Sequence, residues 1–331
     1  MLNPVDRLLE VADLKVHFPI RSGGILRGRY RDLKAVDGIS FDLAPGETLG
    51  IVGESGCGKS TLGRAILQLI EPTCGKVVWL GEDLCGLDQQ QMREHRREMQ
   101  IVFQDPLASL NPRMTVGEII GEPLRAFHPD MPAAEADRKI REMMGNVGLL
   151  PQMINRYPHE FSGGQSQRIG IARAMILKPK LVICDEPVSA LDVSIQAQII
   201  NLLKDLQKKY GLSLIFISHD LSVVRHISHR ILVLYLGRVM ELADRDTLYG
   251  QPRHPYTKAL ISAVPIPDPN IERAKEHVAL AGDPPSPLDP PSGCVFRTRC
   301  VFAKDRCAAE APELRQIAPG HHVTCHFAEQ Q

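Results

Sequence analysis

The stretch Thr48-Leu-Gly-Ile-Val52, followed by Gly53-Glu-Ser-Gly-Cys-Gly-Lys-Ser60, decides the fold. The apolar and β-branched residues at 48–52 predict a buried strand, and the apolar spacing from Thr61 to Ile70 predicts a helix. Between them, two glycines separated by four residues precede a lysine and a serine, which is the phosphate-loop pattern. The order of strand, glycine loop and helix therefore predicts an α/β protein that binds a nucleoside triphosphate.

Each part of this loop has a physical task. Glycines let the backbone N–H groups turn towards phosphate oxygens, and the helix N-terminus adds partial positive charge. Lys59 is expected to reach the β and γ phosphates, and Ser60 to bind Mg²⁺. We expect ATP to contact Gly53, Glu54, Ser55, Gly56, Cys57, Gly58, Lys59, Ser60 and Thr61, with Cys57 using only its backbone N–H. The alternative is a chance glycine-rich turn before a helix.

Composition argues against several classes of protein. The chain of 331 residues carries 39 Lys and Arg against 39 Asp and Glu, so its formal net charge is zero. That balance argues against a protein whose main task is to coat nucleic acid. No apolar run approaches the roughly 18 residues of a membrane span, and the N-terminus lacks a secretory signal. We therefore expect a cytoplasmic protein whose eight cysteines do not form structural disulfides.

A second apolar strand ends in two carboxylates. Leu181-Val-Ile-Cys184 precedes Asp185 and Glu186, and ligands of open α/β sheets bind at the carboxyl ends of the strands. Asp185 is expected to hold Mg²⁺, and Glu186 to orient or deprotonate an attacking water. Alone, such a pair is more often a helix cap or a solvated turn. Beside a phosphate loop it predicts a metal ligand and a base.

Six motifs in order resemble those of the ABC-type ATPases. Besides the two above, Phe161-Ser-Gly-Gly-Gln165 resembles the family's signature, apart from small departures at Phe161 and Ser166. The resemblance implies that Gln104 is a Q-loop residue that also binds Mg²⁺ and that His219 is the switch histidine. It also implies that Asp192 lies in the D-loop and that Phe18 stacks on adenine. The catalytic set would be Glu186, His219 and Lys59.

The resemblance further implies a shared ATP site. In this family two ATPase chains associate head to tail, and the signature of one closes over the ATP of the other. Ser162, Gly163, Gly164 and Gln165 would then act on the partner's ATP, where hydroxyl and N–H groups can stabilise transition-state charge. The implied fold is a P-loop NTPase core of the RecA type with an antiparallel β lobe and a helical lobe.

Composition changes after residue 262, where prolines become frequent: Pro265, Pro267, Pro269, Pro284, Pro285, Pro287, Pro290 and Pro291. We predict an ATPase domain at 1–262, with a helical lobe at about 105–175, and a small Cys/Pro-rich domain at 263–331. The basic stretch from Arg21 to Lys34 is predicted to be a solvated hairpin, with contact to anionic lipid or a permease loop as the alternative.

The segment after the core resembles that of bacterial peptide importers. Arg253-His-Pro-Tyr-Thr257 and Ser292-Gly-Cys-Val-Phe-Arg-Thr-Arg-Cys300 carry this likeness, which is strongest to the dipeptide permeases. It implies a peripheral subunit on the cytoplasmic face of the inner membrane that hydrolyses ATP to power dipeptide import. Its partners would be a homologous ATPase subunit, two transmembrane permease subunits and a periplasmic peptide-binding protein, without nucleic acid. Alternatives are import of oligopeptides, nickel or haem, a soluble ABC ATPase acting as a regulatory or nucleic-acid-associated factor, or a redox sensor.

Four cysteines crowd the C-terminal region: Cys294, Cys300, Cys307 and Cys325. Their spacing differs from the paired C-x2-C arms of zinc ribbons, but four thiolates can enclose an iron–sulfur cluster. The resemblance to peptide importers implies a [4Fe–4S] cluster here. Tetrahedral Zn²⁺ and free thiols remain the alternatives, and His321, His322 or His326 could replace one ligand.

Overall fold

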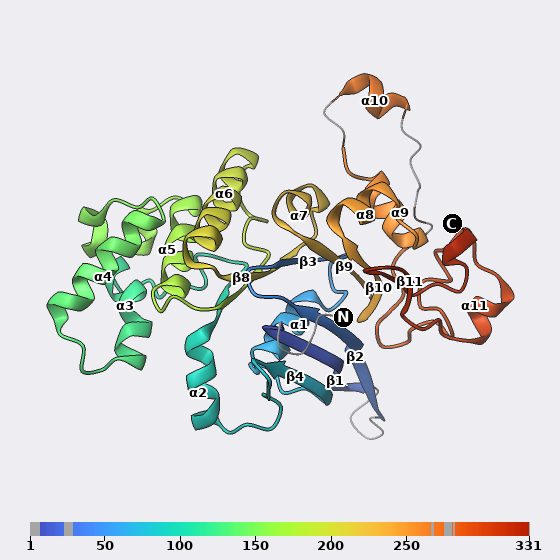
Figure 1. The fold of residues 1–331 in the computed structure, drawn as a ribbon, viewed down its shortest axis with the longest axis horizontal. Coiled ribbons are helices and arrows are strands. Elements are labelled where there is room, and N and C mark those ends of the chain that lie inside the picture. Colours follow the sequence, from blue (N-terminus) through green and yellow to red (C-terminus); the bar gives the residue numbers. More distant parts are fainter. Residues whose placement is uncertain (1–6, 23–28, 266–267, 275–279, 281, 331) are drawn as a thin grey trace. The chain divides into compact units, whose positions relative to one another are not determined.

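The structure, a computed structural model, describes residues 7–22, 29–265, 268–274, 280 and 282–330 (Figure 1). The chain divides into two compact units. The first unit comprises Met1–Leu43, Leu49–Cys85 and His219–Gln331, and the second comprises Ala44–Thr48 and Gly86–Ser218. The phosphate loop belongs to the first unit and the acidic pair to the second.

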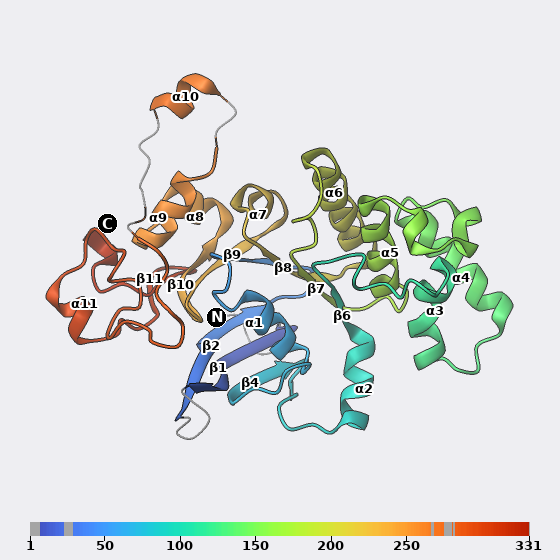
Figure 2. The same cartoon turned by 180° about the vertical axis from the view of Figure 1, so that it is seen from behind.

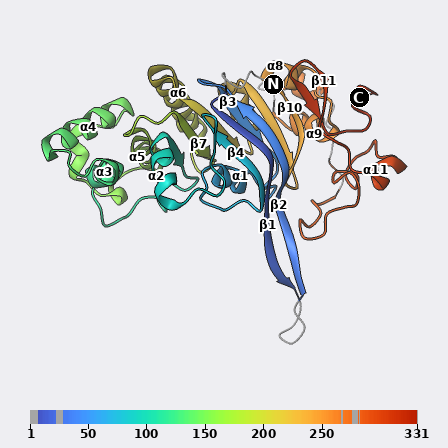
Figure 3. The ribbon, with the colours of Figure 1, turned by 60° about the horizontal axis from the view of Figure 1, so that its bottom comes forward.

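An antiparallel sheet forms one layer of the first unit, with strand order β2-β1-β4-β5. Its strands are β1 Leu9–Ser22, β2 Arg29–Leu43, β4 Cys74–Trp79 and β5 Glu82–Asp83. Figure 3 shows β1 and β2 as a long two-stranded ribbon. The antiparallel pairing expected for the basic stretch is therefore present, while residues 23–28 of the predicted hairpin lie outside the described residues.

The second sheet layer of this unit contains β3, in which every residue of Thr48–Val52 is buried, as the sequence predicted. The strand order in this unit is β11-β12-β10-β9-β3, with β9 Arg230–Tyr235, β10 Arg238–Asp244, β11 Arg315–Ala318 and β12 His321–Val323. Because β12 pairs with β10, the C-terminal segment extends the same sheet as the phosphate-loop strand. The domain boundary placed at residue 262 stays a prediction, since the compact units divide elsewhere.

The helices of the first unit are short. They are α1 Lys59–Ile66, α7 Leu221–Ile227, α8 Arg245–Gly250, α9 Pro255–Ser262, α10 Pro269–Ala274, α11 Asp305–Ala309 and a 3₁₀ turn at Ala328–Gln330. Helix α1 begins two residues earlier and ends four residues earlier than the predicted Thr61–Ile70. The loop passes directly into helix at its start, and Gln68 adopts a left-handed φ of 51° just past its end.

The second unit carries parallel strands in the order β8-β7-β6, with β6 Met99–Val102, β7 Leu181–Asp185 and β8 Ser213–Ser218. Its helices, visible in Figure 2, are α2 Gln89–Glu98, α3 Val116–Phe127, α4 Ala133–Asn146, α5 Gly163–Met175 and α6 Val193–Tyr210, with 3₁₀ turns at Pro151–Asn155 and Pro158–Glu160. Residues 105–175 contain helices and no strand, as expected of a helical lobe. The apolar stripe of α6 is core packing, because Ile199, Leu202, Leu203 and Leu206 are buried.

Candidate nucleotide site

At two positions of the phosphate loop, Gly53 and Gly58, the neighbouring backbone leaves no room for a Cβ atom. A Cβ on Gly53 would lie 2.1 Å from the carbonyl oxygen of Leu234, and one on Gly58 would lie 2.0 Å from that of Ala35. Gly58 also has a φ of 105°, a backbone conformation that residues with a side chain rarely adopt, and it is the N-cap of α1. The loop therefore packs against the backbones of β9 and β2 and then opens into a helix N-terminus, the arrangement that binds phosphate.

Lys59 is buried, with 4% of its surface exposed. Its ammonium donates to the carbonyl oxygens of Gly53 at 2.7 Å and Glu54 at 3.0 Å, so it closes the loop on itself. Burial raises the pKa of the neighbouring Cys57 thiol above its usual value, so this thiol stays protonated at neutral pH. Ser60 and Thr61 follow in the first turn of α1.

Phe18 lies in β1 and pairs with Leu33 of β2. Two residues further along β2, the Ala35 backbone packs against Gly58 of the phosphate loop. The side chain of Phe18 is half-buried. The structure therefore places Phe18 on a ribbon that contacts the loop, and its role against adenine stays a prediction.

In the second unit, the end of β7 presents the acidic pair. Asp185 is the buried last residue of the strand, and Glu186 follows with a left-handed φ of 46°. Gln104, which follows β6, donates from Nε2 to Glu186 Oε2 at 3.0 Å. A non-glycine residue in this backbone region is strained, and such strain concentrates at functional sites. The two residues that the sequence assigned to the Q-loop and the base thus lie in contact.

The signature residues form a helix N-terminus. Ser162 caps α5 in a capping box with Gln165, and Ser162 and Gly163 are exposed. A Cβ on Gly164 would lie 2.6 Å from Ile195 of α6, so glycine lets the two helices approach. Asp192 is the exposed N-cap of α6. The signature therefore places a helix N-terminus at the exposed surface of the second unit.

His219 directly follows β8 and is exposed. It is the first residue of the chain's last segment in the first unit, whereas Gln104, Asp185 and Glu186 belong to the second. Among the predicted site residues, hydrogen bonds connect Lys59 to Gly53 and Glu54 in the first unit. In the second unit, a hydrogen bond connects Gln104 to Glu186.

The four C-terminal cysteines all line one cavity, together with His254, Pro255, Phe296, Arg297, Phe302, Pro312, His326 and Phe327. Burial raises the pKa of Cys294 to about 11, and it also raises the pKa values of Cys300 and Cys325. Among the described residues, no group of three or more His, Cys, Asp or Glu side chains is placed to hold a metal ion. The four cysteines that the sequence assigns to one site thus line one cavity, and the [4Fe–4S] cofactor stays a prediction.

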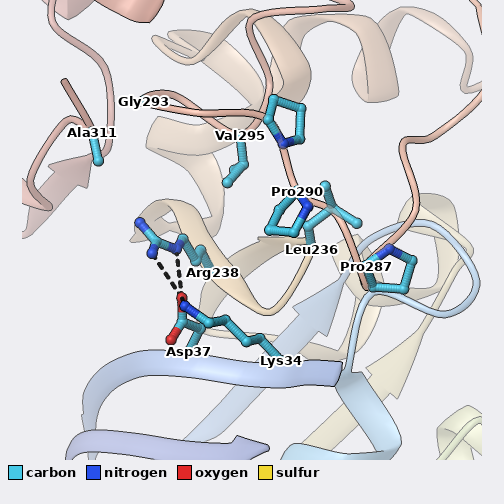
Figure 4. Close-up of a pocket in the computed structure, with 10 residues that line it drawn as sticks. Lys34, Asp37, Leu236, Arg238, Pro287, Pro290, Gly293, Val295 and Ala311 are labelled. Atoms are coloured by element: carbon cyan, nitrogen blue, oxygen red, sulfur yellow. Dashed lines mark hydrogen bonds and ion pairs between the residues drawn. The ribbon is translucent and has the colours of Figure 1, made fainter. Parts of the chain in front are cut away.

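A further cavity of about 220 Å³ lies beside the turn between β9 and β10 (Figure 4). The C-terminal residues Pro287, Pro290 and Val295 form one wall, and Leu236 and Arg238 form another. At its floor, Arg238 donates to Asp37 Oδ2 at 2.7 Å. The proline-rich segment thus packs on the strands that support the phosphate loop.

Sequence reasoning missed two residues that contact this loop, Arg299 and Tyr256. Both stand inside the stretches that resemble peptide importers, but nothing local to them indicated a contact with Glu54. Their partner lies 245 and 202 residues away in the chain.

Among the described residues, no helix combines the length and the apolar character needed to cross a bilayer.

Two family models match the chain. Residues 36–189 match "ABC transporter", and residues 240–307 match "Oligopeptide/dipeptide transporter, C-terminal region". The oligopeptide transport ATP-binding protein OppF of Salmonella typhimurium is 61% identical over 319 residues, covering 96% of this chain and 95% of the relative. The oligopeptide transport ATP-binding protein AppF of Bacillus subtilis is 53% identical over 323 residues, covering 97% of this chain and 98% of the relative.

Solved structures agree on the fold. The dimeric, post-hydrolysis form of the ATP-binding cassette MJ0796 with ADP and Pi bound superposes with a TM-score of 0.63 at 29% identity, covering 72% of this chain and 98% of that one. CbiO1 of Clostridium perfringens, part of an ABC transporter complex, gives 0.63 at 25% identity, covering 74% and 92%. These matches confirm the predicted P-loop NTPase fold and ATPase activity. The chain belongs to the ABC transporter family, among the ATP-binding proteins that carry the oligopeptide/dipeptide transporter C-terminal region.

Proposed function

We propose that this chain is the ATP-hydrolysing subunit of a peptide importer, bound at the cytoplasmic face of the inner membrane. The observation that carries the proposal is its near full-length similarity to oligopeptide transport ATP-binding proteins. Its partners would be a homologous ATPase subunit, two membrane-spanning permease subunits and a periplasmic peptide-binding protein. The proposed assembly does not include nucleic acid.

The ATP would be held by the phosphate loop, with Lys59 on the β and γ phosphates and Phe18 against the adenine. Mg²⁺ would be held by Ser60, Gln104 and Asp185, whose oxygen donors suit this hard cation. Glu186 would handle the attacking water, and His219 would contact the γ phosphate. Contact of Gln104 with Glu186 supports this assignment, because it couples a proposed metal ligand to the proposed base.

The signature would complete the ATP site of the partner ATPase. Exposure of Ser162 and Gly163 at the N-terminus of α5 supports this role, since a helix N-terminus suits a phosphate from another chain. The relative MJ0796 is dimeric with ADP and Pi bound. Hydrolysis would therefore require association of two ATPase chains, and closure and opening of that dimer would drive the permease.

The transported peptides would be oligopeptides, because the relatives named above carry that substrate in their names. The dipeptides favoured by the sequence resemblance are the second candidate, since the matched C-terminal region is named for both. Uptake of labelled di-, tri- and pentapeptides by cells lacking this gene, with and without the restored chain, tests the proposal. We expect restoration to recover pentapeptide uptake. Peptide uptake that is unaffected by loss of the gene would refute the proposed function.

The four C-terminal cysteines would hold a [4Fe–4S] cluster, with Zn²⁺ as the alternative. What supports this proposal is that four thiols line one cavity, and that no described residue lining it carries a carboxylate. When bound, a cluster would cross-link the C-terminal segment through Fe–S bonds. Since burial raises the pKa values of Cys294, Cys300 and Cys325, loading would release protons and would weaken at low pH.

Cys307→Ser is expected to abolish metal loading, because Cys307 is the buried member of the four. Protein purified anaerobically should be brown and contain about four iron and four sulfide per chain, and the variant should contain neither. Cys74→Ser is the matched control, because Cys74 is exposed in β4 and should not affect loading. A colourless wild-type protein with one zinc would contradict the cluster and support the alternative.

A further inference from the structure

Glu54, the second residue of the phosphate loop, is held by two residues from the C-terminal part of the chain. Arg299 donates to it twice, from Nη1 to Oε2 at 2.7 Å and from Nη2 to Oε1 at 3.0 Å. The backbone N–H of Glu54 donates to the hydroxyl oxygen of Tyr256 at 3.0 Å. Both the side chain and the amide of Glu54 are therefore fixed by residues more than 200 positions away.

The ion pair is unlike an ordinary surface pair. The Arg299 side chain is 6% exposed, and it approaches the carboxylate with two parallel hydrogen bonds, the geometry in which arginine pairs are strongest. Its guanidinium lies 5.9 Å from the centre of the Tyr235 ring. The bond to Glu54 raises the pKa of Arg299 above its usual value, so the cation is permanent.

Tyr256 is held rigidly in an aromatic group. It is fully buried, and its ring centre lies 4.8 Å from that of Tyr235 and 5.3 Å from that of Phe296. Burial raises the pKa of its phenol, so the hydroxyl stays neutral and can accept the Glu54 N–H. Phe296 and Arg299 belong to the same turn, in which the Arg299 N–H donates to the Phe296 carbonyl at 3.0 Å.

The segment that carries Tyr256 is itself anchored by a buried carboxylate. Glu241 of β10 accepts hydrogen bonds from the backbone N–H of His254 at 2.9 Å and from His321 Nε2 at 2.7 Å. His254 Nδ1 in turn accepts from the Tyr256 N–H at 3.1 Å. Burial lowers the pKa of His254 to about 4, which keeps this nitrogen an acceptor at neutral pH.

Lys59 contacts a third group of Glu54, because its ammonium donates to the Glu54 carbonyl oxygen at 3.0 Å. A triphosphate that takes the ammonium of Lys59 must draw it away from this carbonyl. The contacts to Arg299 and Tyr256 do not compete with phosphate, since they use the Glu54 carboxylate and N–H. They can therefore keep the loop in shape after Lys59 has turned to the nucleotide.

We infer that Arg299 and Tyr256 are positioning residues of the nucleotide site, which hold the Glu54 end of the phosphate loop in the conformation that binds ATP. The C-terminal region is then a working part of ATP binding in this chain. The inference rests on the proposed assignment of the ATP site to this loop. It requires Arg299 and Tyr256 to act on the affinity for MgATP without contact to the nucleotide.

The test is a calorimetric titration of the full chain with MgATP. Arg299→Gln is expected to raise the Kd about tenfold, as is Glu54→Gln, while the double variant is no weaker than either single one. Arg299→Lys should fall between wild type and Arg299→Gln, because lysine keeps the charge but lacks the planar fork. Arg306→Gln is the matched control, since Arg306 pairs with Glu310 on the surface of the same segment and should leave the Kd unchanged.

Tyr256→Phe keeps the buried ring and removes the hydroxyl that accepts from the Glu54 N–H, so it too should raise the Kd for MgATP. If Arg299→Gln does not fold, Tyr256→Phe and Glu54→Gln test the inference in its place. In the assembled ATPase, Arg299→Gln and Tyr256→Phe should raise KM for ATP and leave kcat at saturating ATP close to wild type. Additive effects of Arg299→Gln and Glu54→Gln, or folded variants with wild-type Kd, would overturn the inference. Lys59→Ala in the same titration tests the proposed ATP site separately from the roles of Arg299 and Tyr256. Wild-type affinity of this variant for MgATP would overturn the ATP site itself.

Discussion

Glu186→Gln is expected to leave ATP bound and to lower the rate of its hydrolysis by about 10³-fold. The substitution keeps the size of the side chain and an oxygen that can accept from Gln104, which now donates to Glu186 at 3.0 Å. It removes the negative charge that would draw the proton from the attacking water, and a positioned base is worth about 10² to 10⁴ in rate. Binding should persist, because Lys59 and Asp185 are unchanged. The variant should therefore accumulate in the ATP-bound, associated state.

Phosphate release by the assembled transporter, together with retention of radiolabelled ATP after gel filtration, measures this expectation. Glu142→Gln is the matched control, because Glu142 is exposed on α4 of the same unit. Its rate should equal that of wild type. If Glu186→Gln releases phosphate at the wild-type rate, Glu186 is not the base.

Lys59→Ala is expected to weaken binding of MgATP by about 10² and to abolish hydrolysis at ordinary ATP concentrations. The ammonium is almost completely buried and is oriented by the carbonyls of Gly53 and Glu54, so it is preorganised at the loop. Charge-assisted hydrogen bonds contribute about 1.5–3 kcal/mol, and 1.4 kcal/mol corresponds to a factor of ten in affinity. The loss should be larger for ATP than for adenosine, since only the phosphates contact the lysine.

Equilibrium titration of the full chain with ATP and with adenosine distinguishes these contributions. Lys76→Ala serves as the control for charge alone, because Lys76 is exposed in β4 of the same unit. Equal losses for ATP and adenosine would show that Lys59 supports the loop without touching phosphate.

Much of the fold could be predicted because its signals are local. The strand at 48–52, the strand that ends at Asp185 and the stripe of α6 each follow from the spacing of apolar residues, and all three are present. Helix boundaries were less accurate, since the end of α1 depends on the left-handed turn at Gln68. The C-terminal segment was predicted to be a separate domain on its proline content. That domain stays a prediction, and within the first unit its strand β12 pairs with β10.

In the candidate site too, local motifs could be predicted from the sequence, whereas contacts between distant residues could not. The phosphate loop, the acidic pair and the signature are short runs, so residue type and order were enough to assign them. Contacts such as Gln104 with Glu186 are pairwise and span 82 residues, so no local pattern could reveal their geometry. Peptide specificity stays a prediction: the resemblance favours dipeptides, and the relatives are named for oligopeptides.

By itself, the sequence determined that a glycine loop between a buried strand and a helix would bind a triphosphate. Glycine conformation, helix capping and apolar periodicity act between neighbours along the chain, and they operate before the fold is complete. Only the tertiary structure decided what holds that loop. Arg299 and Tyr256 reach Glu54 because β12 returns to β10 and because Glu241 anchors the segment before Tyr256. Such contacts depend on backbone paths that meet only after long-range strand pairing, and so no short stretch of sequence records them.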